Sequence, residues 1–271
     1  MKLCVTSWSF PHLTLAEVAG ISKVLGLEGV DVSFFYASGL DKARLLGEPE
    51  AYGAEIAGIT GLPVSNLYYL FGEGLADRNL ALGRPDPQNA QDFEKALAFC
   101  KAAGAPSVFL LPGLVNPGQS RRQAFEASAE ALKPLVAAGH EAGVTVTIEP
   151  HVHGLIESVE MSAEMVERVP GLKLTLDLAH FVTLGYRQDE IESLAPHTGH
   201  VHLRQARQGA LQAKMEEGTI NFPSLLGALR DAGYDGWLSI EYVHQAYMNT
   251  LYDDVLSETV KMRDAVRAWQ G

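Results

Sequence analysis

Residues 144–177 read VTVTIEPHVHGLIESVEMSAEMVERVPGLKLTLD, and this stretch holds the repeating unit of the fold. Two short runs rich in β-forming residues, 144–149 and 172–177, enclose a segment at 157–169 with a helical pattern. Strand, helix and strand in this order predict two parallel strands joined by a crossover helix. The unit therefore predicts an α/β fold.

The same alternation continues along the whole chain of 271 residues. Strands are expected at 3–8, 29–35, 63–71, 107–111, 144–149, 172–177, 198–203 and 237–241. Helices are expected at 14–26, 50–61, 87–104, 120–143, 157–169, 189–194, 222–233 and 251–269. Eight such units predict a single (β/α)8 TIM barrel, and no linker divides the chain, so residues 1–271 are expected to form one domain. An open doubly wound sheet is the alternative, but its GxGxxG turn does not follow the first strand.

The composition narrows the functional classes. The chain has 33 acidic and 21 basic residues, and its net charge of −12 disfavours a nucleic-acid partner or an anionic membrane surface. Cys4 and Cys100 are too few for a disulfide scaffold and favour a reducing compartment. No apolar run reaches the length of about 18 residues that a membrane span needs. A cytoplasmic protein is therefore expected.

Ionisable residues stand at the ends of the last four expected strands: Glu149, Asp177, His200 with His202, and Glu241. Barrel active sites form at these ends. Any one of these residues alone is explained by solvation or turn formation, but three carboxylates converging on one mouth would repel one another. A divalent ion resolves the repulsion, and oxygen ligands with one imidazole suit Mn²⁺, Mg²⁺ or Zn²⁺. His200 and His202 share a strand face, so the spacing does not choose between them.

These strand ends resemble the motifs of the xylose-isomerase-like TIM barrel superfamily, the sugar phosphate isomerase/epimerase group. The resemblance covers the whole chain, through Ile148-Glu149-Pro-His151, Leu176-Asp177-Leu-Ala-His180, His200-Val-His202-Leu-Arg204, the loop 217–223 and residues 233–241. It implies that Glu149, Asp177, His202 and Glu241 hold one divalent metal ion. Mn²⁺ is the first expectation, and Mg²⁺, Co²⁺ and Zn²⁺ are the alternatives. Related barrels are often dimers or tetramers, so a homodimer or homotetramer is expected.

The resemblance also implies a reaction. The leading hypothesis is an isomerase or epimerase of a ketose or keto-sugar that abstracts a proton next to a metal-bound carbonyl and forms an enediolate. Glu149 and Glu241 would remove and return the proton. Return to the same carbon gives epimerisation and return to its neighbour gives isomerisation, and the sequence leaves both open. His151, His153, His180 and Arg204 are the candidate contacts to a small sugar substrate.

Three other functions compete with this hypothesis. A lyase would expel a β-leaving group from a keto-sugar or keto-glycoside, with His151, His153 or His180 as general acid. An AP-endonuclease-like phosphodiesterase needs histidines on the third and fourth strands, but none occurs between His12 and His140. A sugar-binding barrel without catalysis does not explain the four-residue set.

Two further features of the early part of the chain are left open. An aromatic wall is expected from Trp8, Phe10, Phe34, Tyr36 and Tyr68, with ordinary packing as the alternative. The loop at 72–87 is either a lid over the barrel mouth or a dimer contact.

Overall fold

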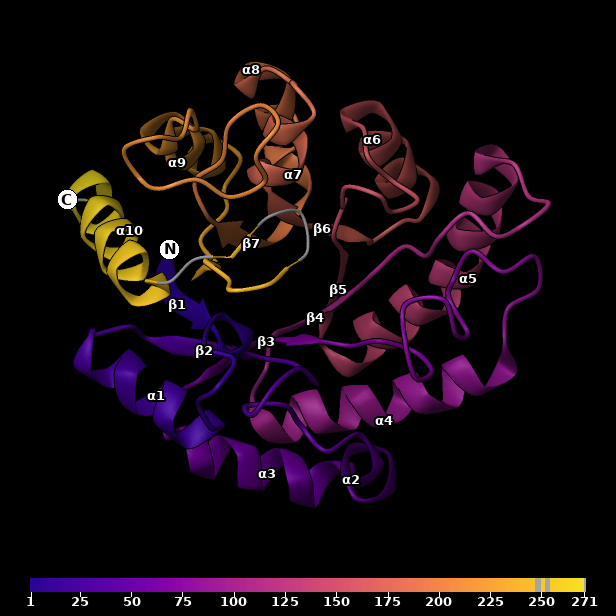
Figure 1. Ribbon diagram of the computed structural model, residues 1–271. Helices are drawn as coiled ribbons and strands as arrows, with labels where there is room; N and C mark the ends of the chain where they lie inside the picture. Colours follow the sequence, from indigo (N-terminus) through magenta and orange to yellow (C-terminus); the bar gives the residue numbers. More distant parts are fainter. Residues whose placement is uncertain (247–249, 252–253, 271) are drawn as a thin grey trace.

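The computed structural model describes residues 1–246, 250–251 and 254–270. Parallel strands pair in chain order and close into a barrel, which confirms the predicted single (β/α)8 fold (Figure 1). The strands are β1 (Lys2–Thr6), β2 (Gly29–Val32), β3 (Val64–Tyr68), β4 (Ser107–Leu110), β5 (Thr145–Ile148), β6 (Lys173–Asp177), β7 (Thr198–Leu203) and β8 (Trp237–Ile240).

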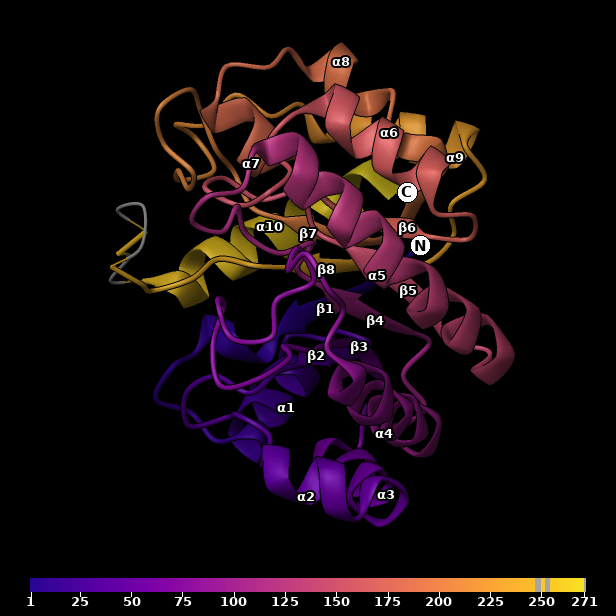
Figure 2. The same ribbon diagram turned by 90° about the vertical axis from the view of Figure 1, so that its right-hand side faces the viewer.

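The helices surround the barrel, as Figures 1 and 2 show. They are α1 (Leu15–Val24), α2 (Lys42–Gly47), α3 (Pro49–Thr60), α4 (Pro87–Ala103), α5 (Arg121–Ala142), α6 (Val159–Arg168), α7 (Leu178–Thr183), α8 (Gln188–Glu192), α9 (Phe222–Asp231) and α10 (Val255–Gln270). Two 3₁₀ turns, η1 (Ser7–Ser9) and η2 (Ala195–His197), complete the elements. In the described part of the chain, no helix combines the length and the hydrophobicity that crossing a bilayer requires.

Most expected boundaries lie within a few residues of the observed ones, and the differences have local causes. The first strand ends at Thr6 because η1 turns the chain at the barrel mouth. The short helices α2 and α7 were not expected, and each begins at an aspartate, Asp41 or Asp177, whose carboxylate accepts a backbone N–H. The last helix begins at Val255 rather than at 251, and residues 252–253 of the expected range lie outside the described residues.

Helix α1 illustrates how the sequence sets these boundaries. Thr14 accepts the backbone N–H of Glu17, and the Glu17 carboxylate accepts the backbone N–H of Thr14, as the expected capping box requires. The buried face of α1, which includes Leu15 and Val18, packs into the hydrophobic core.

Polar side chains fill part of the barrel interior, where such barrels usually pack branched apolar residues. Thr147 and Thr175 share a hydrogen bond of 2.7 Å, and the Asn66 amide donates to Ser107 at 2.7 Å. Asp31 of β2 contacts His200 of β7 although these strands are not neighbours in the sheet, so this contact crosses the interior. The apolar core therefore lies mainly between the strands and the helices.

Candidate active site

The four residues expected to bind a metal meet at the C-terminal ends of β5 to β8. Glu149, Asp177, His202 and Glu241 are all buried, and one ligand atom from each lies within 4.8 Å of the others. Nδ1 of His202 lies 2.8 Å from Oε1 of Glu149 and 3.4 Å from Oε2 of Glu241. The structure therefore brings together the set that the sequence singled out.

Strand register places these side chains at one level. Asp177 pairs with His202 across β6 and β7, and the backbone N–H of Glu241 donates to the carbonyl of Leu203. The backbone N–H of Glu149 donates to the carbonyl of Leu110 at the end of β4. Because the strands are parallel and in neighbouring register, their last residues converge on the same mouth.

The electrostatics of this cluster favour a bound cation. Burial, together with the charges of Glu241 and Glu149, raises the pKa of Asp177 to about 6 against the opposing effect of Arg204. Burial alone would lower the pKa of His202, but Glu241 and Glu149 hold it well above its usual value. Oε2 of Glu241 is buried without a hydrogen-bond partner among the described residues. Three buried carboxylates, one of which has an oxygen without a hydrogen-bond partner, and one imidazole fit a divalent ion that prefers oxygen and nitrogen ligands.

Arg204 supplies positive charge inside the same cluster. Its Nη2 atom lies 2.6 Å from Oδ2 of Asp177, 3.4 Å from Oε2 of Glu241 and 2.9 Å from Nε2 of His180. The sequence placed Arg204 on the same strand face as His202 but did not predict its pairing with a ligand carboxylate. A metal ion at this cluster would therefore compete with Arg204 for Asp177.

The candidate substrate-contacting histidines occupy different depths. The rings of His151 and His180 lie close together, with centroids 3.9 Å apart. Burial lowers the pKa of both, so they are neutral at pH 7. His153 is exposed at the rim, with φ of 62° and its backbone N–H donating to Glu157. His151 and His180 thus adjoin the buried cluster, and His153 lies at its edge.

A cavity of about 740 Å³ opens above the cluster at the C-terminal ends of the strands. Glu149, Glu241 and Arg204 line it, together with His151 and His153. Asp177 and His202 are not among its lining residues in the described chain. The two glutamates therefore face the cavity, and Asp177 and His202 lie below them.

Aromatic side chains from η1, from the segment after β2, and from β3 and β4 form one wall of the cavity: Trp8, Phe34, Phe35, Tyr36, Tyr68 and Phe109. Phe10, which was expected in this wall, packs instead in the hydrophobic core. Trp8 has a polar function as well, because its Nε1–H donates to Oε1 of Glu241 at 2.7 Å. The sequence did not predict that Glu241 would be the acceptor of this N–H.

The loop that follows β3 contributes to the cavity only in part. Its residues Gly72 to Leu75 line the cavity, and the Lys42 ammonium donates to the carbonyl of Leu70 at 2.8 Å and to that of Gly72. The sequence analysis gave no role to Lys42, which fixes the start of this loop against α2.

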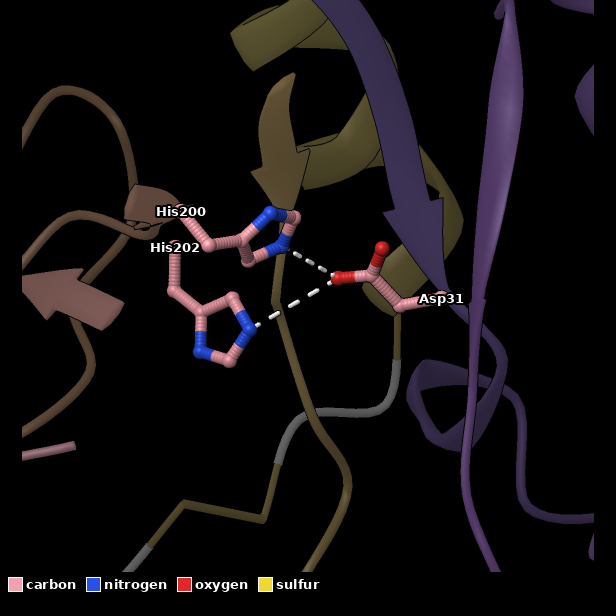
Figure 3. Close-up of side chains that lie close together, drawn as sticks. All are labelled: Asp31, His200 and His202. Atoms are coloured by element: carbon pink, nitrogen blue, oxygen red, sulfur yellow. Dashed lines mark hydrogen bonds and ion pairs between the residues drawn. The ribbon is translucent and has the colours of Figure 1, made fainter. Parts of the chain in front are cut away.

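Asp31 is a further residue that the sequence analysis missed. It lies inside β2, is fully buried, and its Oδ2 atom is 2.8 Å from Nε2 of His200 and 3.6 Å from Nε2 of His202. The sequence did contain a sign of this residue, because a buried strand rarely contains an aspartate and Asp31 interrupts the apolar run at 29–32. Both histidines of β7 face Asp31 (Figure 3), but of the two His202 also reaches the carboxylate cluster, through its Nδ1 atom.

Comparison with known proteins agrees with this architecture. A putative hydroxypyruvate isomerase from Homo sapiens is 28% identical over 257 residues, which cover 87% of each chain. The structure of D-psicose 3-epimerase with D-tagatose from Clostridium cellulolyticum H10 has a TM-score of 0.74 at 15% identity and covers 100% of this chain and 98% of that one. The IOLI protein with a bound zinc atom has a TM-score of 0.73 at 17% identity and covers 99% of both.

The human relative is named as an isomerase, in agreement with the expectation of an isomerase or epimerase. The family described as xylose isomerase-like TIM barrel matches residues 21–267. The resemblance drawn from the strand-end motifs is thereby confirmed, and the chain belongs to the xylose isomerase-like TIM barrel family.

Proposed function

We propose that this protein is a divalent-metal-dependent isomerase or epimerase of a ketose or keto-sugar. The observation that carries the proposal is the buried cluster of Glu149, Asp177, His202 and Glu241 at the base of a cavity of about 740 Å³. The isomerase and epimerase names of the relatives support the reaction class.

These four residues would hold the ion. When bound, a divalent metal would act as a Lewis acid that polarises the carbonyl group of the substrate. Carboxylate ligands favour Mn²⁺ or Mg²⁺, and the imidazole also suits Zn²⁺ or Co²⁺. The zinc atom of the IOLI protein supports a metal in this fold, and we keep Mn²⁺ as the first candidate here.

Glu149 and Glu241 are the residues best placed to move protons. Both line the cavity, and they come from β5 and β8 and therefore approach it from different strands. One carboxylate would remove the proton from the carbon next to the carbonyl, and the other would return one. Trp8 orients Glu241 by its hydrogen bond.

The remaining polar groups would bind and orient the substrate. The neutral imidazole of His151 lines the cavity and can exchange hydrogen bonds with hydroxyl groups, and Arg204 can pair with an anionic group. His180 would act through Arg204, because its Nε2 atom lies 2.9 Å from Nη2 of Arg204 and its Nδ1 atom accepts the backbone N–H of Val152. The aromatic wall opposite them excludes water from the reacting carbon and strengthens the electrostatic interactions in the site.

The first test is the metal content per chain after dialysis, in the wild type and in His202→Ala. We expect about one divalent ion per chain in the wild type and its loss in the variant, because a ligand is removed. His140→Ala, on the exposed surface of α5, is the matched control and should retain the ion. Failure of the wild type to bind Mn²⁺, Mg²⁺, Co²⁺ or Zn²⁺ after reloading would contradict the proposal.

The second test identifies the reaction. The metal-loaded protein is incubated in D₂O with hydroxypyruvate, D-psicose or D-tagatose. Solvent deuterium at the carbon next to the carbonyl, in recovered substrate or in an isomer, is the expected result. A product that has lost water would instead identify a lyase.

A further inference from the structure

Asp31 occupies the centre of a hydrogen-bonded network beneath the proposed metal site. Its Oδ2 atom faces Nε2 of His200 at 2.8 Å and Nε2 of His202 at 3.6 Å (Figure 3). Its Oδ1 atom accepts the hydroxyl of Ser65 at 2.6 Å and lies 3.8 Å from Sγ of Cys4. All five side chains are buried, so the Asp31 carboxylate is fixed from several sides.

The imidazole of His202 lies between this network and the ligand cluster. Nδ1 faces Glu149 and Glu241, and Nε2 faces Asp31. A ligating nitrogen must offer its lone pair, so coordination through Nδ1 requires the ring proton on Nε2. Nε2 of His202 has no hydrogen-bond partner within the described part of the chain. Oδ2 of Asp31, at 3.6 Å, is the acceptor that this nitrogen faces.

Asp31, His200 and His202 also satisfy a loose criterion for a second metal site, because their ligand atoms lie within 4.8 Å of one another. The spacing favours hydrogen bonding instead. Ligand atoms bound tetrahedrally at about 2.0–2.1 Å stand roughly 3.3 Å apart, whereas Asp31 and His200 are 2.8 Å apart. That separation is the usual length of a hydrogen bond from an imidazole to a carboxylate.

We propose that Asp31 is a positioning residue for the metal centre: it holds the His202 imidazole from below, with the proton on Nε2 and with Nδ1 presented to the ion. The inference rests on the proposed function, since it assigns His202 as a metal ligand. His200 assists by fixing the oxygen of Asp31 that His202 uses. Carboxylates that orient a ligating histidine in this way raise its basicity and set its tautomer.

The decisive measurement is the tautomer of His202 in the zinc-loaded wild type, by two-bond ¹H–¹⁵N correlation spectroscopy of the histidine rings. His202→Gln assigns the signals. We expect zinc on Nδ1 and the proton on Nε2. Coordination through Nε2 with the proton on Nδ1 would overturn the proposal, and this result needs no change at Asp31.

The second measurement is the Kd for Zn²⁺, by competition with a chelating dye, in Asp31→Asn and in Ser65→Ala. Asp31→Asn is expected to weaken binding about 10- to 100-fold, because the residue that orients the ligand has been replaced. Ser65→Ala removes a donor from the other oxygen of Asp31 and should weaken binding less than Asp31→Asn does, because His200 still holds the carboxylate. Equal Kd values in the wild type and Asp31→Asn would overturn the inference alone. No metal binding by the wild type would overturn the proposed function and the inference together.

Discussion

The two halves of the barrel contribute different chemistry to the same cavity. The strands β5 to β8 end in ionisable residues, Glu149, Asp177, His202 and Glu241. The ends of β1 to β4 and the loops that follow them carry aromatic residues, Trp8, Phe34, Phe35, Tyr36, Tyr68 and Phe109. The half with ionisable residues would therefore hold the ion and move protons, and the aromatic half would enclose the substrate in an apolar wall. Charged groups act more strongly beside such a wall than they do in water.

Two residues of the first half nevertheless reach the ionisable half. Trp8 donates a hydrogen bond to Glu241, and Asp31 contacts His200 and His202 from across the barrel. The two halves are therefore not fully separate in function, and their roles can be tested by substituting residues in each half.

The largest effect is expected in the ionisable half, from Glu149→Gln and Glu241→Gln. Loss of a positioned proton-transfer group lowers a rate by about 10² to 10⁴. The measurement is kcat for deuterium exchange in D₂O, together with the metal content of each variant. Glu130→Gln on the exposed face of α5 is the control and should retain the wild-type rate. A glutamine variant that keeps its metal and its full rate would show that its residue transfers no proton.

The sequence predicts that the ionisable strand ends meet because one geometric rule governs them. Parallel strands of a barrel direct their C-terminal ends to the same mouth, so Glu149, Asp177 and Glu241 had to converge. The alternation of strand and helix predicts the barrel for the same reason. These features depend on periodicity and chain order, which a sequence contains.

The depth at which each side chain lies, and the contacts that side chains make across the barrel, could not be predicted from the sequence. His200 and His202 have the same strand parity, and the structure shows that both face Asp31 while His202 also meets Glu149. Arg204 could turn toward solvent, substrate or Asp177, because a long side chain has many rotamers. Phe10 packs in the core rather than in the cavity because η1 redirects the chain after β1.

An intermediate effect is expected from Arg204→Gln, which changes the charge balance of the ionisable half. Breaking a buried ion pair leaves Asp177 uncompensated and costs about 3 kcal/mol of unfolding free energy in the metal-free protein. Saturating Mn²⁺ should restore most of this loss, since the ion supplies the missing positive charge and binds only the folded state. Urea unfolding with and without Mn²⁺ measures both values.

The control for Arg204 is Arg122→Gln, which removes an arginine that pairs with Glu164 on the exposed surface. Its melting temperature should be unchanged, with or without the ion. A metal-free Arg204→Gln protein as stable as the wild type would show that Arg204 does not balance the charge of the cluster.

The smallest effect is expected from Trp8→Phe, which tests the contact from the aromatic half to Glu241. The change keeps an aromatic ring in the wall but removes the N–H that donates to Oε1 at 2.7 Å. A hydrogen bond to a charged group contributes about 1.5–3 kcal/mol, and water from the adjoining cavity can replace part of it, so kcat should fall about tenfold. Tyr68→Phe removes a polar atom from the same wall without touching Glu241 and should lower kcat less. Equal losses in the two variants would mean that the wall acts only by enclosure, and that the indole N–H does not orient the glutamate.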